Sequence, residues 1–224
     1  YHRTKHDSEA MVRANGRIPF RVYRPSAVLG HSQTGFIDKI DGPYYFFKAL
    51  QKLRESWPRS IPLVGIEGGY INVVPVDFVV DALVHLSHQP KLDGRCFHLT
   101  DPKARRVGEV LNVFARAAHA PEMAFRHDPK LFAMLPEPVT QSVQRSKPIQ
   151  NVFNQLLRDL QVPRSVLQFV NYPTRFDSTA TQKILDKAKI RVPALEDYAW
   201  RLWDYWERHL DPDLSIDRSL KGAV

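Results

Sequence analysis

Apolar residues recur along the chain with two spacings, and these spacings predict alternating strands and helices. Short apolar runs rich in β-branched and aromatic residues predict strands, at 18–23, 70–76 and 96–99. Apolar positions that recur every three or four residues predict helices, at 4–15, 48–55, 77–86, 107–118, 180–188 and 195–210. Because strands and helices alternate, we expect an α/β fold.

Residues that favour turns and caps set the expected ends of these elements. Asn15-Gly16 predicts the end of the first helix. Pro25 predicts the end of the following strand, because proline supplies no hydrogen-bond donor to a ladder. Asp77 is the expected N-cap of the helix after the second strand, and the run 176–179 predicts the N-cap of a later helix.

The last predicted helix has the clearest period in the chain. Its apolar residues fall at i, i+3, i+4, i+7, i+11 and i+15, namely Leu195, Tyr198, Ala199, Leu202, Trp206 and Leu210. Trp200, Trp203 and Tyr205 widen this stripe. We therefore expect the helix to pack on a large apolar surface.

Two stretches interrupt the alternation of strands and helices. Residues 31–70 form an aromatic-rich excursion around Tyr44-Tyr45-Phe46-Phe47. It either lines a ligand cleft, including a tunnel for an acyl chain, or makes a surface subdomain with its own core. Beyond Pro121 the pattern is mainly helical with repeated proline breaks, and after Pro212 it becomes polar, as in a linker.

Composition narrows the class of protein. The chain has 224 residues, of which 43% are hydrophobic, enough for a substantial core. No apolar run reaches the roughly 18 residues of a membrane span, and the start has neither a signal pattern nor a Met, so we expect a chain that is cut at its start. The single Cys96 predicts a buried thiol in a reducing compartment, which indicates a cytoplasmic protein, with peripheral membrane contact left open.

The net charge of the chain is +8, which favours anionic partners such as nucleic acid, a membrane surface or phosphorylated small molecules. Lys and Arg are scattered along the whole sequence without a block of like charge, however. Most of them are therefore expected to be solvated surface residues.

The pair Tyr1 and Lys5 is the main candidate for catalysis. The two residues are four apart, which places them on one face of a helix. A nearby ammonium stabilises a phenolate and lowers a tyrosine pKa from about 10, so that the tyrosine can give a proton to a developing alkoxide. Taken alone, this spacing also fits an ordinary surface pair.

Other polar clusters give weaker indications. His2 and His6 share a helix face, as do His85 and His88, but no third ligand is spaced to complete a metal site, so we expect no metal. The run 65–69 contains Gly65, Gly68 and Gly69 but lacks the G-x-G-x-x-G spacing of a dinucleotide-binding turn, and it leads into a strand.

Together, the N-terminal motifs resemble the extended short-chain dehydrogenase/reductase family. The resemblance rests on Tyr1-x-x-x-Lys5, Glu9, an apolar strand, and the segment Arg24-Pro25-Ser26-Ala27-Val28-Leu29-Gly30. It implies that Tyr1 is the proton donor, and that Lys5 binds the nicotinamide ribose and tunes Tyr1. It also implies that Pro25, Ser26, Ala27 and Val28 lie beside the nicotinamide of NADPH, or less commonly NAD, and it gives Arg24 only a structural role.

Later motifs narrow the resemblance to fatty acyl-CoA reductases, and in particular to the reductase domain of bacterial two-domain enzymes. These motifs all lie outside the N-terminal helix, at 31–35, 41–46, 72–79, 97–102 and 198–212. The run 219–224 resembles the approach to the second reductase domain. The glycine-rich turn and the third catalytic Ser or Thr of the family are not matched, so the resemblance implies the C-terminal part of the reductase domain.

The resemblance also implies a domain organisation. We expect the C-terminal part of a Rossmann-like doubly wound domain at 1–120, with a substrate-lobe insertion at about 31–70. A mostly helical substrate lobe and C-terminal helical extension are expected at 121–212, followed by a linker at 213–224.

The predicted function of the parent protein is NADPH-dependent reduction of fatty acyl-CoA to an aldehyde or alcohol. This chain alone is expected to be inactive. The expected partners are acyl-CoA or another acyl thioester and a second reductase domain in the same parent chain, without nucleic acid or a transmembrane segment. Two alternatives stay open. One is another extended short-chain enzyme, such as a nucleotide-sugar epimerase or sterol-type dehydrogenase, and the other is a non-catalytic anion-binding module, suggested by the pI of about 9.6.

Overall fold

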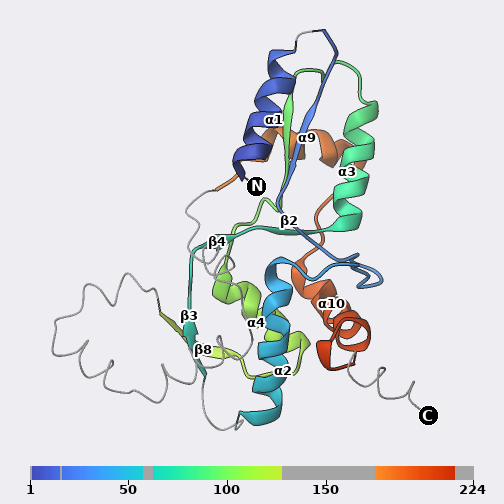
Figure 1. Ribbon diagram of the computed structural model, residues 1–224. Coiled ribbons are helices and arrows are strands. Elements are labelled where there is room, and N and C mark those ends of the chain that lie inside the picture. The colour runs from blue at the N-terminus through green and yellow to red at the C-terminus, as the bar shows by residue number, and fades with distance from the viewer. Residues whose placement is uncertain (1, 16, 58–62, 128–174, 215–224) are drawn as a thin grey trace, which may run out of the picture. The chain divides into compact units, whose positions relative to one another are not determined.

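The computed structural model describes residues 2–15, 17–57, 63–127 and 175–214, and the chain divides into two compact units (Figure 1). Unit 1 combines Tyr1–Leu29, Asn72–Lys103 and Arg175–Pro193, and unit 2 combines Gly30–Ile71, Ala104–Thr174 and Ala194–Val224. Each unit is therefore assembled from three separate stretches of sequence.

Unit 1 is built on short pairs of parallel strands. β1 (Val22–Pro25) pairs with β6 (Cys96–Leu99), and β2 (Ala27–Leu29) pairs with β5 (Val73–Pro75). The helices of this unit are α1 (His2–Ala14), α3 (Val76–His88), α9 (Thr179–Leu185) and the 3-10 helix η2 (Asp186–Ala188). Parallel pairing needs long crossover connections, and the helix α3 lies in the connection from β5 to β6.

The core of unit 1 forms where one face of α3 meets the strands and α9. Phe78, Ala82 and Leu86 are spaced four residues apart, so they lie on the same side of α3, and all three are buried. They pack in one cluster with buried residues of β5, β6 and α9, which are Val74, Phe97, Leu99 and Leu185. The helix predicted at 77–86 is thus confirmed, but its expected apolar face of Val79, Val80, Leu83, Val84 and Leu86 is not the core face, because Val80, Leu83 and Val84 are exposed.

Among its described residues, unit 2 combines four helical segments with two short strand pairs. The helical segments are η1 (Gly42–Phe46), α2 (Phe47–Ser56), α4 (Val107–Ala117) and α10 (Leu195–His209). β3 (Leu63–Ile66) runs parallel to β8 (Met123–His127), and β4 (Tyr70–Ile71) runs antiparallel to β7 (Arg105–Arg106). The helix α4 contacts both α2 and α10.

Phe47, the first residue of α2, is at the centre of the core of unit 2. The centre of its ring lies 4.8 Å from the ring centres of Tyr44 and Phe114, 5.2 Å from that of Trp203 and 5.6 Å from that of Trp206. All five side chains are buried. Of the two readings of the aromatic excursion, the structure therefore supports a packed core, and it explains the apolar stripe of α10.

The strand predicted at 18–23 is displaced in the structure. β1 begins only at Val22 and Ile18 is exposed, whereas the expected end is confirmed, because Pro25 is the last residue of β1. The N–H groups of Val22 and Ser26 donate to carbonyls of the β6 segment at 3.0 and 3.2 Å. Alternate residues therefore face β6, so Pro25 faces away, where this ladder does not need its missing N–H.

The predicted N-cap at Asp77 is wrong as well. α3 begins at Val76 after Pro75, so Asp77 lies within the first turn of the helix. A carboxylate there still interacts favourably with the positive end of the helix dipole, which explains the misleading signal. The later N-cap run is confirmed, because α9 begins directly after Ser178.

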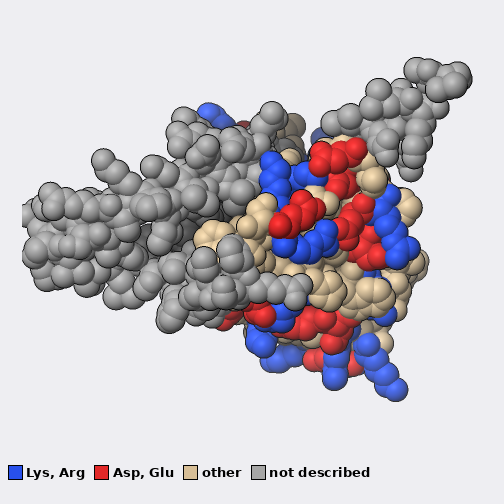
Figure 2. Space-filling view, turned by 90° about the horizontal axis from the view of Figure 1, so that it is seen from below, with Lys and Arg blue, Asp and Glu red and all other residues tan. Residues whose placement is uncertain are grey.

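Charged side chains on the face shown in Figure 2 are mixed in sign, with Lys and Arg beside Asp and Glu. Within unit 2, Lys48 lies 2.8 Å from Asp211, and Arg54 lies 2.6 Å from Glu207. The positive charge of the chain is thus not gathered into a single basic patch on this face. No helix in the described ranges has both the length and the apolar character to span a lipid bilayer.

Candidate active site

The carboxyl ends of β1 and β6 lie side by side in unit 1, because the strands are parallel and Pro25 is opposite Leu99. β1 leads through Ser26 into β2, and β6 leads into Thr100. In open α/β sheets, ligands bind beyond the carboxyl ends of the strands. The segment 25–28, predicted to lie beside a nicotinamide, is therefore at the edge where a ligand is expected.

Buried hydroxyl groups without partners mark this edge. The Oγ of Ser26 and the Oγ1 of Thr100 are shielded from solvent, and neither has a hydrogen-bond partner among the described residues. Thr100 as a whole is only 1% exposed. Buried polar groups are nearly always satisfied in native proteins, so two unsatisfied hydroxyls at adjacent strand ends are what a polar ligand would complete.

Asn72, which immediately precedes β5, fixes the chain beyond β6. Its Nδ2 donates to the backbone O of Asp101 at 2.7 Å, and its Oδ1 accepts from the backbone N of Asp101 at 2.9 Å. The Nε2 of Gln182 donates to the backbone O of Thr100 at 3.2 Å. These bonds hold Thr100 and Asp101 in place at the strand end.

Thr100, Asn72 and Gln182 were not predicted as site residues, although Asn72 and Thr100 lie in motifs of the family resemblance. An Asn directly before a strand and a Thr directly after one are weak signals by themselves. They gain meaning only when the pairing of the strands is known.

The helix α1 holds the Tyr1 and Lys5 positions. Tyr1 lies outside the described residues, and Lys5 is exposed on α1. The assignment of both residues to catalysis and cofactor binding therefore stays a prediction.

Glu9 connects α1 to β1. Its carboxylate accepts hydrogen bonds from Arg24 at 2.7 and 3.0 Å and from Arg13 at 2.7 Å. The bond from Arg24 does most to lower the pKa of Glu9 to about 2; partial burial opposes this and Arg13 adds to it. Arg24, expected to be structural, thus links the predicted catalytic helix to the strand that carries Ser26.

Other candidates from the sequence lie apart from this edge. Across the described residues, no group of three or more His, Cys, Asp or Glu side chains is arranged to hold a metal ion. Cys96 is a free, half-buried thiol at the start of β6. Gly68 has a φ of +69°, and its carbonyl accepts a bond from Arg106 at 3.2 Å, so the run 65–69 consists of the end of β3 and the turn that leads into β4.

Sequence comparison finds relatives for the first part of the chain. Residues 1–83 match the family model described as male sterility protein. Glycine betaine reductase ATRR of Emericella nidulans is 35% identical over 104 residues, which are 46% of this chain and 8% of that protein. Aldehyde reductase lnbA of Aspergillus flavus is 32% identical over 85 residues, which are 38% of this chain and 8% of that protein.

Solved structures show the same fold. The terminal R domain from the myxalamid PKS-NRPS biosynthetic pathway matches with a TM-score of 0.58 and 25% identity, over 89% of this chain and 48% of that one. A thiolation-reductase di-domain from an archaeal non-ribosomal peptide synthetase matches with a TM-score of 0.56 and 14% identity, over 90% of this chain and 39% of that one. The second likeness concerns the fold alone.

With its Rossmann-like α/β fold and its family match over residues 1–83, the chain is similar to the extended short-chain dehydrogenases/reductases, a class of oxidoreductases. Residues 1–83 match the male sterility protein model, and the two relatives above are reductases by name. The expected resemblance to this class of reductases is thereby confirmed. The chain spans about 8% of the length of the curated relatives it matches.

Proposed function

We propose that this chain is the C-terminal part of a reductase domain that uses NADPH to reduce an acyl thioester, with NAD a less favoured cofactor. The observation that supports this proposal most is the match of residues 1–83 to the male sterility family. These residues include the Tyr1-x-x-x-Lys5 pair and the strands β1 and β2 that flank Ser26.

The proposed chemistry needs a hydride and a proton. The bound nicotinamide supplies the hydride to the thioester carbonyl carbon. Tyr1 donates its phenolic proton to the carbonyl oxygen as negative charge develops there, and the Lys5 ammonium stabilises the phenolate that remains. The carbon–sulfur bond then breaks, the hydroxyl proton passes to the departing thiol, and an aldehyde is left. A second reduction would give the alcohol.

The residues at the strand ends fit a nicotinamide. A carboxamide group offers both a donor and an acceptor, which suits the unpartnered hydroxyls of Ser26 and Thr100. Ala27 and Val28 are exposed on the same segment, so their apolar side chains are available to a flat ring. Pro25, Ser26, Ala27 and Val28 are therefore our candidates for holding the nicotinamide.

The thioester has two candidate carriers. Coenzyme A is suggested by the fatty acyl-CoA reductase motifs at 31–46 and 198–212. A carrier-protein thioester is suggested by the likeness to the terminal R domain from the myxalamid PKS-NRPS pathway. Comparing turnover of the intact parent with acyl-CoA and with the same acyl group on a thiolation domain would decide between them.

The remaining expectations from the sequence are part of the proposal. They are domain boundaries at 120 and 212, a second reductase domain in the same parent chain, and a cytoplasmic location. A nucleotide-sugar epimerase or a sterol-type dehydrogenase is the nearest alternative and would respond to its own substrate in the same assay. The mixed charges in Figure 2 do not favour an anion-binding module, at least on that face.

The decisive experiment is Tyr1→Phe in the intact parent protein. We expect thioester-dependent NADPH oxidation to fall by about 10²–10⁴-fold, because only the proton donor is lost, while NADPH binding stays unchanged. Lys5→Met should lower both turnover and NADPH affinity. Arg3→Met, which removes a highly exposed charge from the same helix, is the matched control.

Unchanged turnover in Tyr1→Phe would contradict the proposal. The 224-residue chain alone should bind NADPH weakly, since it contains no glycine-rich dinucleotide-binding turn. Tight NADPH binding in a titration of this chain would count against the assignment as well.

A further inference from the structure

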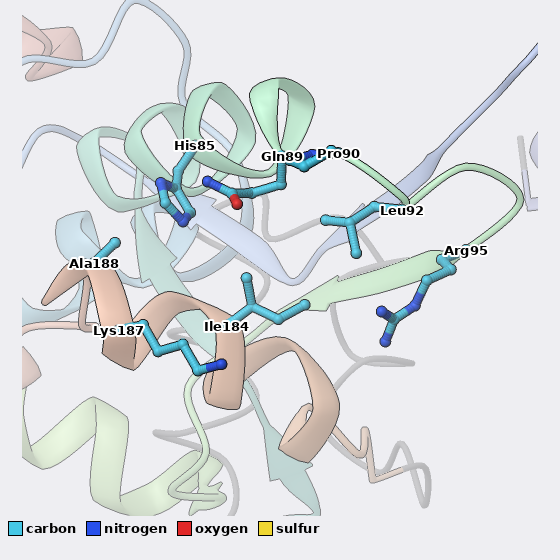
Figure 3. A pocket seen from close by; sticks show the side chains of 8 residues that line it. All are labelled: His85, Gln89, Pro90, Leu92, Arg95, Ile184, Lys187 and Ala188. Carbon is cyan, nitrogen blue, oxygen red and sulfur yellow. The ribbon is translucent and has the colours of Figure 1, made fainter.

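A separate pocket lies in unit 1 at the opposite end of β6 from the candidate active site (Figure 3). Its volume is about 340 Å³. His85 and Gln89 at the C-terminal end of α3, Arg95 directly before β6, and Lys187 in η2 contribute its polar side chains. Thr100, in contrast, follows the other end of β6, so the pocket is not part of the carboxyl edge.

The lining of the pocket contains no Asp or Glu. In Figure 3, the polar ends of His85, Gln89, Arg95 and Lys187 border the same opening. Acidic residues close to it in sequence have other partners, because Asp93 pairs with Arg21 at 2.9 Å and Asp186 pairs with Arg191 at 3.1 Å. The pocket therefore keeps its positive charge.

The donors that line the pocket are available to a ligand. No hydrogen bond joins the side chains of His85, Gln89 or Lys187 to any of the described residues. The Arg95 guanidinium lies 5.5 Å from the centre of the Phe97 ring, a cation–π contact that orients it without using its N–H groups. Three chain segments thus bring several free donors to one cavity.

Capping of a helix C-terminus does not explain why these cationic side chains lie at the pocket. Positive side chains often lie near helix C-termini, where they meet unpaired carbonyls. At the end of α3, however, Arg21 fills this role, since its Nη1 donates to the backbone O of Leu86 and, at 2.8 Å, to that of Ser87. The cations in the pocket are therefore not needed to cap α3.

We propose that this pocket binds a small phosphate monoester. A phosphate group has enough oxygens to accept from the guanidinium, ammonium, imidazole and amide groups together, whereas a carboxylate would leave some of them unpaired. The buried Leu92 and the half-buried Ile184 provide an apolar floor for a short organic group. The volume is at the lower end of the range for ligand pockets, which begins at about 300 Å³.

The test is a titration of the 224-residue chain with n-butyl phosphate, inorganic phosphate and butyrate at a fixed ionic strength near 0.15 M, the condition that screens weak surface binding. NMR signals of the His85 ring and the Gln89 side chain report occupancy. We expect saturable shifts with n-butyl phosphate at a Kd about tenfold lower than with butyrate. Inorganic phosphate should bind at the same place more weakly, because it lacks the organic group.

Matched variants distinguish binding in the pocket from general attraction of the phosphate to positive charge on the protein. Lys187→Gln and Arg95→Gln should each weaken n-butyl phosphate binding by about tenfold, since each removes a charge-assisted hydrogen bond. Lys103→Gln removes the same charge from an exposed position of unit 1 outside the lining and should leave the Kd unchanged. Equal loss in all three variants, equal affinity for butyrate, or shifts that never saturate would each overturn the proposal.

Discussion

The two units differ in the side chains that form their cores. In unit 2, Phe47 and the four aromatic side chains around it are at most 4% exposed. In unit 1, α3 buries one face, but Val80 and Val84 on another part of its surface are 52% and 51% exposed, and Met11 on α1 is 74% exposed. Since burial of apolar area is the main stabilising contribution to folding, unit 2 should hold most of the stability of this chain.

The largest test of this difference is Phe47→Ala. Removing a fully buried ring that four other aromatic rings contact should lower the free energy of unfolding by about 3–5 kcal/mol. Val80→Ala in unit 1 is the exposed counterpart and should change it by less than about 0.5 kcal/mol. Urea unfolding followed by tryptophan fluorescence measures both, and similar losses in the two variants would refute the comparison.

Two glycines with the same backbone angle test packing in the two units. Gly35 and Gly94 both have a φ of +74°, so alanine at either position costs about 1–2 kcal/mol of backbone strain. A Cβ at Gly35 would lie 2.1 Å from the backbone O of Arg201, whereas at Gly94 it would meet no atom within 4 Å. Gly35→Ala should therefore destabilise the chain by about 1–3 kcal/mol more than Gly94→Ala.

Thermal unfolding of the two alanine variants side by side measures this difference. Equal destabilisation would mean that the contact around Gly35 is looser than the structure shows.

A buried ion pair in unit 2 sets the next expectation. Burial opposes ionisation of Asp211, but hydrogen bonds from Lys48 at 2.8 Å and Gln51 at 2.7 Å outweigh it and lower the pKa of Asp211. Lys48→Met should raise this pKa and cost about 1–3 kcal/mol, because a buried carboxylate loses a charged partner. Unfolding experiments and an NMR titration of Asp211 measure the two effects.

Arg208→Met, which breaks an exposed pair with Asp204, is the control for that experiment and should cost less than about 0.5 kcal/mol. If both variants lost the same stability, burial of the Lys48 pair would have no energetic consequence.

The smallest effect is expected at Glu9 in unit 1. Its pKa in the folded chain is about 2, below the ordinary 4.5, so its bonds to Arg24 and Arg13 stabilise α1 fully above about pH 4.5. This contribution should be lost as the pH falls from 4.5 towards 2, and it should stay below about 1 kcal/mol. Amide chemical shifts of α1 should follow this titration, and Glu9→Gln should abolish it.

The sequence predicted the elements whose signal is local. The stripe of 195–210 and the existence of the helix α3 follow from helical spacing within a single segment. The buried face of α3, with Phe78 and Ala82, was not predicted, because the more apolar positions Val80 and Val84 are exposed. The start of β1 depends on the strand that pairs with it, because its ladder to β6 begins only at Val22, and a single segment does not contain that information. For this reason the predicted strand start at Ile18 failed while the helix α10 was found.

The candidate site was predictable only in part, for the same reason. The place of 25–28 at a strand end follows from one segment and a family resemblance. The partner of Asn72 lies 29 residues away at Asp101, and the pocket near Lys187 joins segments about a hundred residues apart. Such contacts need the folded chain.

The interleaving of the two units has a practical consequence for cutting and exchanging parts of this protein. The chain passes from one unit to the other after Leu29, Ile71, Lys103, Thr174 and Pro193. No continuous segment contains a whole unit, so neither can be cloned by choosing two end points. A chimaera that takes unit 2 from a relative must be joined correctly at all five crossings, and a single protease cut leaves both units tied together by the remaining connections.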